Sequence, residues 1–471
     1  MATIISQAPL YSTLPVAQDV ILTVKNSSVV GTESRVKFIA KVYISDKAIN
    51  ISTDTPVGTF KTTPNNAGVG MFDFRPIIES FVSADNLGNL YSQYKTDANK
   101  SIPIHLIDKY STNKKLIRFL AVEFGVEYLG ATDCSGNQSN DVIREACGEE
   151  KNSITYTLFN GYLKHSDVLD IEYGRFGYSV NRFNLRTVAL GGVGEFLTNA
   201  PSTQYANIDD YGTLSVFSKP SSFNINISTI YDTLYTYYDS SGVISSEAVL
   251  NSTSNGGYDV WNSDSKNQAL HLGCFPANLK NWSSTFTAAI PTLSYYTILC
   301  RDNSEDAVSE LITININCPT LKGYEPVRLT WLNQWGAWDY YTFNMKSTKS
   351  ISTKGSTYQQ IEGTWNDSTY QVNGYKGGKK SFRVNAVEKI SMNTDFVSEA
   401  ESEWFEELIN SPEVYVIEGY KTQATDVVLN SYVSPVRLTT SSYTKKTVAN
   451  DKLMQYTFEV EKSKTLRTQS V

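Results

Sequence analysis

The chain has 471 residues, of which 12% are aromatic and only 19% are charged, so it is long enough for several hydrophobic cores and is not a disordered polypeptide. Its formal net charge of -7 gives no overall positive field that would attract nucleic acid or an anionic membrane. The sequence lacks a leader-like start and a long apolar run, which predicts a protein made in the cytoplasm without a signal peptide and without membrane insertion.

Residues 1–19 are largely unpatterned and predict an N-terminal arm. Residues 20–130 alternate between apolar and polar side chains, which predicts a β-sandwich-like domain. The turn-forming residues 64–68 are expected to join two of its strands as a hairpin, and a short helix near 74–84 is expected to close one end. The predicted strands are 20–25, 35–44, 57–62, 69–74 and 116–129.

Residues 131–153 are polar and predict a surface loop at the first domain boundary. A middle β region is expected at 154–320, and a C-terminal β domain at 321–471. The strands predicted for the middle region are 155–163, 176–185, 213–217 and the two hairpins within 225–250 and 294–318. The fold class predicted for the whole chain is mainly β, with several β-sandwich-like domains and two helices, near 74–84 and 396–410.

The helix near 396–410 begins with a capping-box pattern, in which Glu401 can reach back to the amide of Ser398, and Pro412 ends it. Its apolar stripe is expected to face the core. The residues of this stripe are Val397, Ala400, Trp404 and Leu408, and those expected to face water are Glu399, Glu403, Glu406 and Glu407.

Residues 327–345 carry three tryptophans and predict a β-hairpin. If residues 333–336 form the turn, Gly336 takes the position that favours a positive φ angle, and Trp331 lies opposite Trp338. The residues expected on the apolar face are Leu329, Trp331, Trp338 and Tyr340, and those expected on the other face are Arg328, Thr330, Asp339 and Tyr341.

Trp335, at the tip of this hairpin, has two interpretations. It can fold back on its own hairpin, or it can anchor a contact with another subunit. The acidic helix face likewise is either a solvated surface or a contact to a basic one, and the last thirty residues are locally basic. The candidate subunit-contact residues are Trp335, Glu403, Glu407, Lys445 and Lys446.

Residue patterns of known catalytic or metal sites are not found in the sequence. His105, His165 and His271 stand alone, so each is expected to be a packed or surface imidazole. Residues 374–381 lack phosphate-loop spacing and predict a turn, and residues 191–194 lack the third glycine of a dinucleotide fingerprint. Asp209 and Asp210 could be considered as the paired carboxylates of glycoside hydrolysis. Neighbouring strand side chains point to opposite faces, so these two are not expected to act as an acid/base pair.

Because such patterns are missing, we expect no enzyme activity, no cofactor and no metal site. The five cysteines show no CxxC spacing and are expected to be buried thiols. Their positions are 134, 147, 274, 300 and 318.

Four stretches, spread from the first domain to the end of the chain, carry a resemblance. They are VGTFKTTPNNAGVGMFDFRPIIESFV, VRLTWLNQWGAWDYYTFNM, SEAESEWFEELINSPEVYVI and PVRLTTSSYTKKTVANDKLMQYTFEVEKS. Together they resemble a group of large β-rich virion proteins of tailed bacteriophages.

This resemblance implies a structural virion protein that assembles as multiple copies in the tail tip, baseplate or tail–neck region. Its partners would be copies of itself and other phage tail proteins, and no catalytic residue is implied. The alternative is a tail protein on the same scaffold that binds a host-surface receptor or glycan, or degrades a glycan, because exposed aromatic rings stack on sugars.

Overall fold

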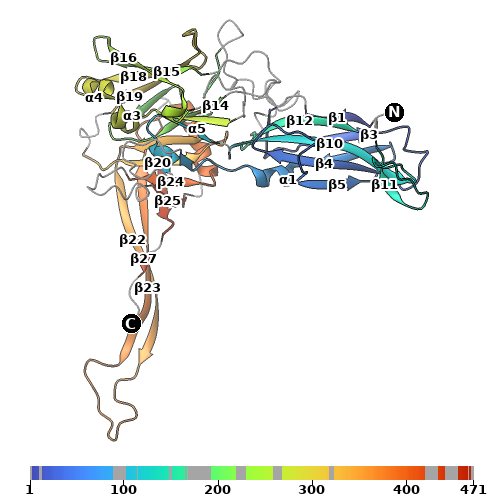
Figure 1. Cartoon of the computed structure of the whole chain (residues 1–471). Helices are drawn as coiled ribbons and strands as arrows, with labels where there is room; N and C mark the ends of the chain where they lie inside the picture. The colour runs from blue at the N-terminus through green and yellow to red at the C-terminus, as the bar shows by residue number, and fades with distance from the viewer. Residues whose placement is uncertain are drawn as a thin grey trace. The chain divides into compact units, whose positions relative to one another are not determined.

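The computed structural model is mainly β, with 47% of the described residues in strands and 11% in helices, which confirms the predicted fold class (Figure 1). The chain divides into two compact units. Unit 1 comprises Met1–Ile316 and Asn333–Asp339, and unit 2 comprises Asn317–Leu332 and Tyr340–Val471. The predicted boundary at 320/321 lies close to the boundary at 316/317, and the predicted regions before residue 317 all fall within unit 1.

The structure describes residues 3–9, 13–88, 102–113, 115–147, 151–164, 167, 193–218, 230–257, 268–317, 323–418, 433–440, 454–464 and 466–467. The predicted strand at 176–185 lies outside these ranges. Within them, no helix is long and apolar enough to cross a membrane.

Unit 1 begins with a β-sandwich, in which a six-stranded sheet of order β2-β12-β10-β4-β5, with β11 on β10, packs against a three-stranded sheet of order β1-β3-β6. The rings of Phe72 and Phe124, one from each sheet, lie 5.7 Å apart. Alternate side chains of β10 are fully buried, as its sequence pattern predicts. The strands are β1 (Ile4–Gln7), β2 (Thr13–Pro15), β3 (Ile21–Lys25), β4 (Lys37–Ser45), β5 (Gly58–Thr62), β6 (Val69–Asp73), β10 (Ile117–Leu129), β11 (Ile143–Glu145) and β12 (Asn152–Phe159).

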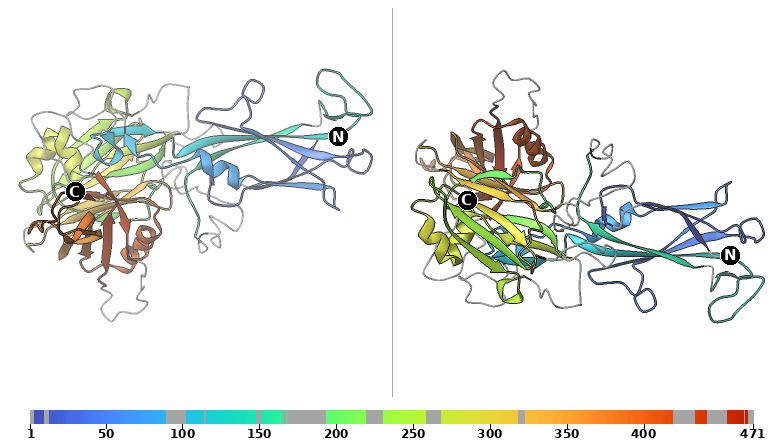
Figure 2. Two further views of the ribbon diagram at one scale, coloured as in Figure 1. Left: turned by 90° about the horizontal axis from the view of Figure 1, so that it is seen from below. Right: turned by 90° about the horizontal axis from the view of Figure 1, so that it is seen from above.

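The helix α1 (Arg75–Ile78), followed by a 3-10 turn at Glu79–Phe81, lies at one end of this sandwich in both views of Figure 2, as predicted. The hairpin predicted around residues 64–68 is wrong, because β5 pairs with β4 and β6 pairs with β3. The turn, with Gly68 at φ +74°, therefore carries the chain from one sheet to the other. The predicted loop at 131–153 also contains the short strand β11, which pairs with β10.

The rest of unit 1 contains a five-stranded sheet of order β13-β19-β18-β15-β16 and smaller sheets of order β14-β17-β9 and β7-β8. The pairs β15–β16 and β18–β19 confirm the two hairpins predicted for the middle region. The strands are β7 (Leu87–Gly88), β8 (Ile102–Pro103), β9 (Tyr110–Asn113), β13 (Thr203–Ala206), β14 (Thr213–Ser218), β15 (Asp232–Tyr238), β16 (Val243–Leu250), β17 (Gln268–Gly273), β18 (Tyr295–Arg301) and β19 (Ile312–Ile316). The 3-10 turns are Ile104–Leu106 and Thr253–Asn255.

Two helices of this region, α3 (Pro276–Trp282) and α4 (Ser284–Ala289), were not predicted from the sequence. Each is two turns or shorter, and a segment of this length is too short for a helical repeat of apolar residues to be recognised in the sequence. Phe286 of α4 packs its ring between Tyr237 and Tyr296, at 5.4 and 5.8 Å. The aromatic strand residues therefore hold α4 against the sheet.

Unit 2 is built on one sheet of order β21-β20-β24-β25-β26-β23-β22, with β27 on β23. The helix α5 (Glu399–Asn410) has the predicted capping box, in which Ser398 N–H donates to Glu401 Oε2 at 2.8 Å. The strands are β20 (Val327–Leu332), β21 (Trp338–Phe343), β22 (Ser347–Gln360), β23 (Gly378–Asn393), β24 (Val414–Ile417), β25 (Val433–Leu438), β26 (Thr457–Lys462) and β27 (Leu466–Arg467).

The tryptophan hairpin forms between β20 and β21, but with a longer loop than predicted. Asn333 N–H donates to Ala337 O at 2.8 Å, so the loop closes over five residues rather than four. The side chain of Asn333 also accepts the N–H groups of Trp335 and Ala337, both at 3.0 Å. Gly336 has φ +75°, as predicted.

The predicted faces of this hairpin are wrong, because one extra loop residue exchanges the two faces of a strand. Trp331 packs on Trp404 of α5 with ring centroids 4.9 Å apart, and Tyr341 packs on the same ring at 6.2 Å. Arg328 instead lies over the ring of Tyr340, at 5.3 Å. Trp331 and Tyr341 therefore share the face that α5 covers.

We expect Gly336→Ala to lower the free energy of unfolding by about 2 kcal/mol or more, since the left-handed conformation alone costs a non-glycine residue about 1–2 kcal/mol. A Cβ atom at Gly336 would also lie 2.0 Å from Asn160 O. The measurement is urea unfolding followed by circular dichroism. Gly374→Ala is the control, because a Cβ there meets nothing within 4 Å, and its stability should stay unchanged or rise slightly.

Candidate interaction surface

Trp335, the first candidate contact residue, is 2% exposed. Its ring stacks on Phe159 with centroids 6.4 Å apart, and its indole N–H donates to Asn199 Oδ1 at 3.0 Å. Neither interpretation of the hairpin tip describes this packing, because the ring is buried against other parts of the same chain and not against its own hairpin. Trp335 therefore offers no surface to a second subunit, and it leaves the candidate set.

The two glutamates among the candidate contact residues differ in their exposure. Glu403 is exposed on α5, whereas Glu407 is 1% exposed, so the expectation that Glu407 faces water is wrong. Ala400, which was expected in the buried stripe, is exposed, whereas Phe405 is buried together with Trp404 and Leu408. The buried face of α5 is therefore rotated from the predicted stripe, and it includes Glu407. Lys445 and Lys446 lie outside the described residues.

A serine, a histidine and an aspartate meet inside unit 1. Ser215 Oγ lies 2.7 Å from His271 Nδ1, and His271 Nε2 lies 3.1 Å from Asp85 Oδ2. These residue types form hydrolytic triads elsewhere, but the three residues are 3%, 0% and 1% exposed, so no substrate can reach them. Asp85 also accepts the backbone N–H of Lys115, and its carbonyl accepts the indole N–H of Trp338. The network therefore joins β14, β17 and the segment around Asp85 as a structural link.

We expect His271→Leu to lower the free energy of unfolding by about 3 kcal/mol, because it leaves the buried side chains of Asp85 and Ser215 without their partner. Denaturant unfolding of the full chain measures this. Asp209→Asn serves as the control, since Asp209 is exposed and only pairs with Lys280 at the surface, and a change below about 0.5 kcal/mol is expected. A comparably small effect for His271→Leu would show that the buried network contributes little.

The acid pair Asp209–Asp210 and His105 give no reactive cluster, and His165 lies outside the described residues. Asp209 bridges to Lys280, while Asp210 is buried and accepts the N–H of Asn207 at 2.8 Å, so the two carboxylates do not converge. His105 is buried with its ring edge-on to Trp338. Across the ranges given above, no group of three or more His, Cys, Asp or Glu side chains could hold a metal ion.

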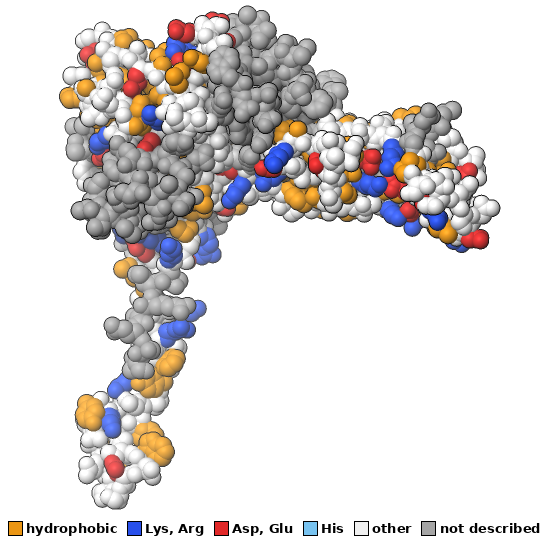
Figure 3. All heavy atoms as spheres, in the orientation of Figure 1, with side chains coloured by type: hydrophobic (Ala, Val, Ile, Leu, Met, Phe, Trp, Pro, Cys, Tyr) orange, Lys and Arg blue, Asp and Glu red, His pale blue; other side chains and the backbone are white. Residues whose placement is uncertain are grey.

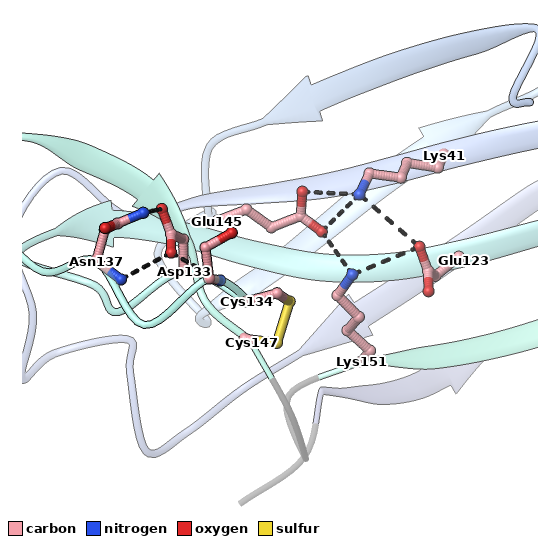
Figure 4. The surroundings of a disulfide bond; sticks show 9 residues. Lys41, Glu123, Asp133, Cys134, Asn137, Glu145, Cys147 and Lys151 are labelled. Carbon is pink, nitrogen blue, oxygen red and sulfur yellow. Dashed lines mark hydrogen bonds and ion pairs between the residues drawn. A yellow bond between two sulfur atoms is a disulfide. The ribbon is translucent and has the colours of Figure 1, made fainter. Parts of the chain in front are cut away.

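Two of the five cysteines are joined. Cys134 and Cys147 form a disulfide with Cα atoms 4.8 Å apart, which corrects the expectation of buried thiols at these positions (Figure 4). Cys274 and Cys300 are free and buried, as expected, and burial raises the pKa of the Cys300 thiol to about 12. Cys318 lies outside the described residues. This disulfide has no CxxC signature, because the two bonded cysteines meet only when the segment between them folds back.

Beside the disulfide, two lysines and two glutamates form an ion-pair network (Figure 4). Lys41 and Lys151 contact Glu145 at 2.8 and 3.1 Å, and each lies 3.8 Å from Glu123. Partial burial acts to raise the pKa of Glu145, but the hydrogen bonds from Lys41 and Lys151 outweigh it. The pKa of Glu145 therefore lies below its usual value of 4.5.

Because the pKa of Glu145 is lowered in the folded chain, its ionised form stabilises the fold above pH 4.5, and this stabilisation is lost as the pH falls through the folded pKa. We expect Glu145→Gln to cost about 1 kcal/mol at neutral pH and nothing in acid. The measurement is unfolding of both proteins across this pH range. Glu79→Gln, in an exposed ion pair with Arg75, should differ little from the parent at any pH, and a pH-independent cost of Glu145→Gln would contradict the prediction.

The longest strands of unit 2 form a two-stranded arm, residues 347–393. β22 and β23 pair antiparallel along their whole length, and Figure 1 shows them projecting together from the rest of unit 2. In the described part of the chain, β23 has its other edge covered by β26 at Lys389–Asn393 and by β27 at Asn385 and Ala386. Ten consecutive residues of β22, 348–357, are exposed. Most of the arm is therefore a ribbon with solvent on both faces.

The tip of the arm, residues 361–377, is held by its own hydrogen bonds. Thr364 N–H donates to Gln371 O at 2.9 Å, and Asn373 N–H donates to Glu362 O at 3.3 Å. Large hydrophobic side chains nevertheless face solvent, with Trp365 81% exposed. Figure 3 shows hydrophobic and basic side chains side by side along the arm. The exposed hydrophobic residues of the arm are Ile351, Ile361, Trp365, Tyr370, Val372, Tyr375 and Phe382.

The arm is basic although the chain is acidic. Residues 347–393 contain seven Lys and Arg residues and three Asp and Glu residues, so the arm carries 7 - 3 = +4. The chain as a whole carries -7, which leaves -7 - 4 = -11 on the remaining residues. The basic residues of the arm are Lys349, Lys354, Lys376, Lys379, Lys380, Arg383 and Lys389, and the acidic ones are Glu362, Asp367 and Glu388.

An exposed apolar surface rimmed by charged residues is typical of a site where another molecule binds. The arm is not predicted by the sequence pattern, because β22 reads STKSISTKGSTYQQ and shows no alternation between apolar and polar residues. The features that could have indicated these strands were the Ser, Thr and Tyr content of β22 and the turn predicted at 374–381, where β23 begins at Gly378.

No protein-family model matches the chain, and no curated protein matches it.

Proposed function

We propose that the chain is a structural subunit that assembles in several copies, with the arm as its assembly element. The observation that carries the proposal is the exposure of Trp365, Tyr370 and Tyr375 at the end of a two-stranded ribbon. A ribbon of two strands is marginally stable alone, so a partner that covers the arm would stabilise it. Burying a large aromatic side chain contributes roughly 2 kcal/mol, and three such residues would give a substantial contact.

The proposed setting is the virion of a tailed bacteriophage, at the tail tip, baseplate or tail–neck region, beside other tail proteins. The four sequence stretches that resemble such virion proteins support this setting. The Cys134–Cys147 disulfide supports it too, because disulfides persist on virion surfaces and are rare in a reducing cytoplasm. Under this proposal the chain acts through its contacts and performs no catalysis.

The second candidate function is binding or degradation of a host-surface glycan. The same exposed rings favour it, since Trp365 and Tyr375 could stack on sugar rings. Binding of the full chain on a glycan array, lost on Trp365→Ala and accompanied by a monomeric mass, would favour this function over assembly.

We expect removal of the arm to prevent assembly. Ile351 pairs with Glu388, so replacing residues 352–387 by Asn-Gly closes a short hairpin and leaves the base of the arm in the sheet. Because this arm-less variant lacks the exposed tip, it should be monomeric under conditions in which the full chain is a multimer. The measurement is molar mass by light scattering.

Circular dichroism and thermal unfolding are the controls, and both should show that the arm-less variant keeps its fold. A full chain that stays monomeric over the accessible concentration range would contradict the proposed function. An arm-less variant with the mass of the full multimer would show that assembly uses another surface.

A further inference from the structure

We propose that the arm of one copy docks on the acidic remainder of a second copy and not on the second copy's arm. This inference rests on the proposed function, and it names the partner of the arm. It follows from three properties of the described residues: the charge of the arm, the composition of its free edge and the exposure of its tip.

Charge disfavours contact between two arms and favours contact between an arm and the acidic remainder of the chain, which is every residue outside 347–393. Two arms would bring net charges of +4 and +4 together, whereas an arm and the rest of a second chain bring +4 and -11. Like charges placed opposite each other in a sheet destabilise it, and complementary charge accelerates encounter and fixes orientation. The arm of one copy therefore binds the acidic remainder of the second copy.

The free edge of the arm is protected against pairing with itself. β22 is the last strand of its sheet, and it carries Lys349 and Lys354 but no acidic residue. Lysines on an edge strand prevent edge-to-edge pairing, because two such edges would set ammonium groups side by side. The edge of β22 is therefore a poor contact between arms, and the contact lies at the tip.

The tip has the composition of an anchor in a docking site. Trp365 and Tyr375 are 81% and 77% exposed, and Lys376 Nζ lies 5.8 Å from the ring of Tyr375. Aromatic residues dominate the centres of protein contacts, and charged residues form the rims. The apolar rings would bury against the second copy, while Lys376, Lys379 and Lys380 meet its acidic side chains.

A mixing experiment tests the proposal. A fluorescently labelled arm-less variant keeps the acidic remainder, so it can receive an arm, but it has no arm that could dock on another copy. When it is mixed with unlabelled full chain, it should enter complexes with the full chain, although it is monomeric alone. Sedimentation velocity followed at the wavelength of the label measures this capture.

Two outcomes of this mixture overturn the proposal and separate it from the proposed function. If the full chain forms multimers that exclude the labelled variant, the arms pair with each other, and the inference fails while the structural function stands. If the full chain is monomeric in the same experiment, both fail.

A matched pair of charge variants tests the role of the lysines. Substituting Glu for Lys376, Lys379 and Lys380 in the full chain should weaken capture of the arm-less variant by about tenfold or more, and capture by the parent should weaken with added salt. The control substitutes Glu for three exposed lysines of unit 1, Lys25, Lys37 and Lys47, which changes the net charge equally. Equal loss of capture in both variants would overturn the proposal.

Discussion

The hydrogen bonds of one side chain, Asn333, set the geometry on which the centre of the chain depends. Its amide N–H₂ group donates to Leu197 O at 2.8 Å and to Asp339 Oδ1 at 2.9 Å, while its amide oxygen accepts two backbone N–H groups of the loop. All these groups are buried, so each would cost free energy without its partner. Together they fix a five-residue loop, and the length of the loop decides which face of each hairpin strand meets α5.

The loop also explains the burial of Trp335. Its backbone N–H is held by Asn333, and its ring lies within a cluster that includes Phe159, Leu116 and Leu197. Thr198 Oγ1 donates to Asp339 Oδ1 at 2.7 Å, which fixes the other end of the same loop. A tryptophan at the end of a hairpin is thus a core residue of its own chain.

Residue patterns predicted the parts of the fold that short stretches of the chain decide. The alternation in β10, the capping box at Ser398 and the positive φ angle of Gly336 each follow from local physics that the sequence carries. The faces of the hairpin could not be predicted in the same way, because a single loop residue exchanges them and no local pattern counts loop residues. The assignment of β5 and β6 to different sheets failed for a similar reason, since turn residues do not reveal which strand pairs with which.

The candidate site was harder to predict than the fold. The residue types of Trp335 and Glu407 indicate a contact surface, but the packing around them buries both side chains. The arm was not predicted, because a strand with solvent on both sides needs no alternation between apolar and polar residues. β22 therefore lacks the pattern by which strands are recognised. The Cys134–Cys147 bond depends on the fold of the segment between them, which spacing alone does not encode.

The division of the chain has a topological consequence. The polypeptide passes between the two units at 316/317, again at 332/333 and again at 339/340. A protease that cut once near the first crossing would release neither half, because the downstream fragment still carries Asn333–Asp339 embedded in unit 1. Such a molecule tolerates a nick in its backbone without coming apart.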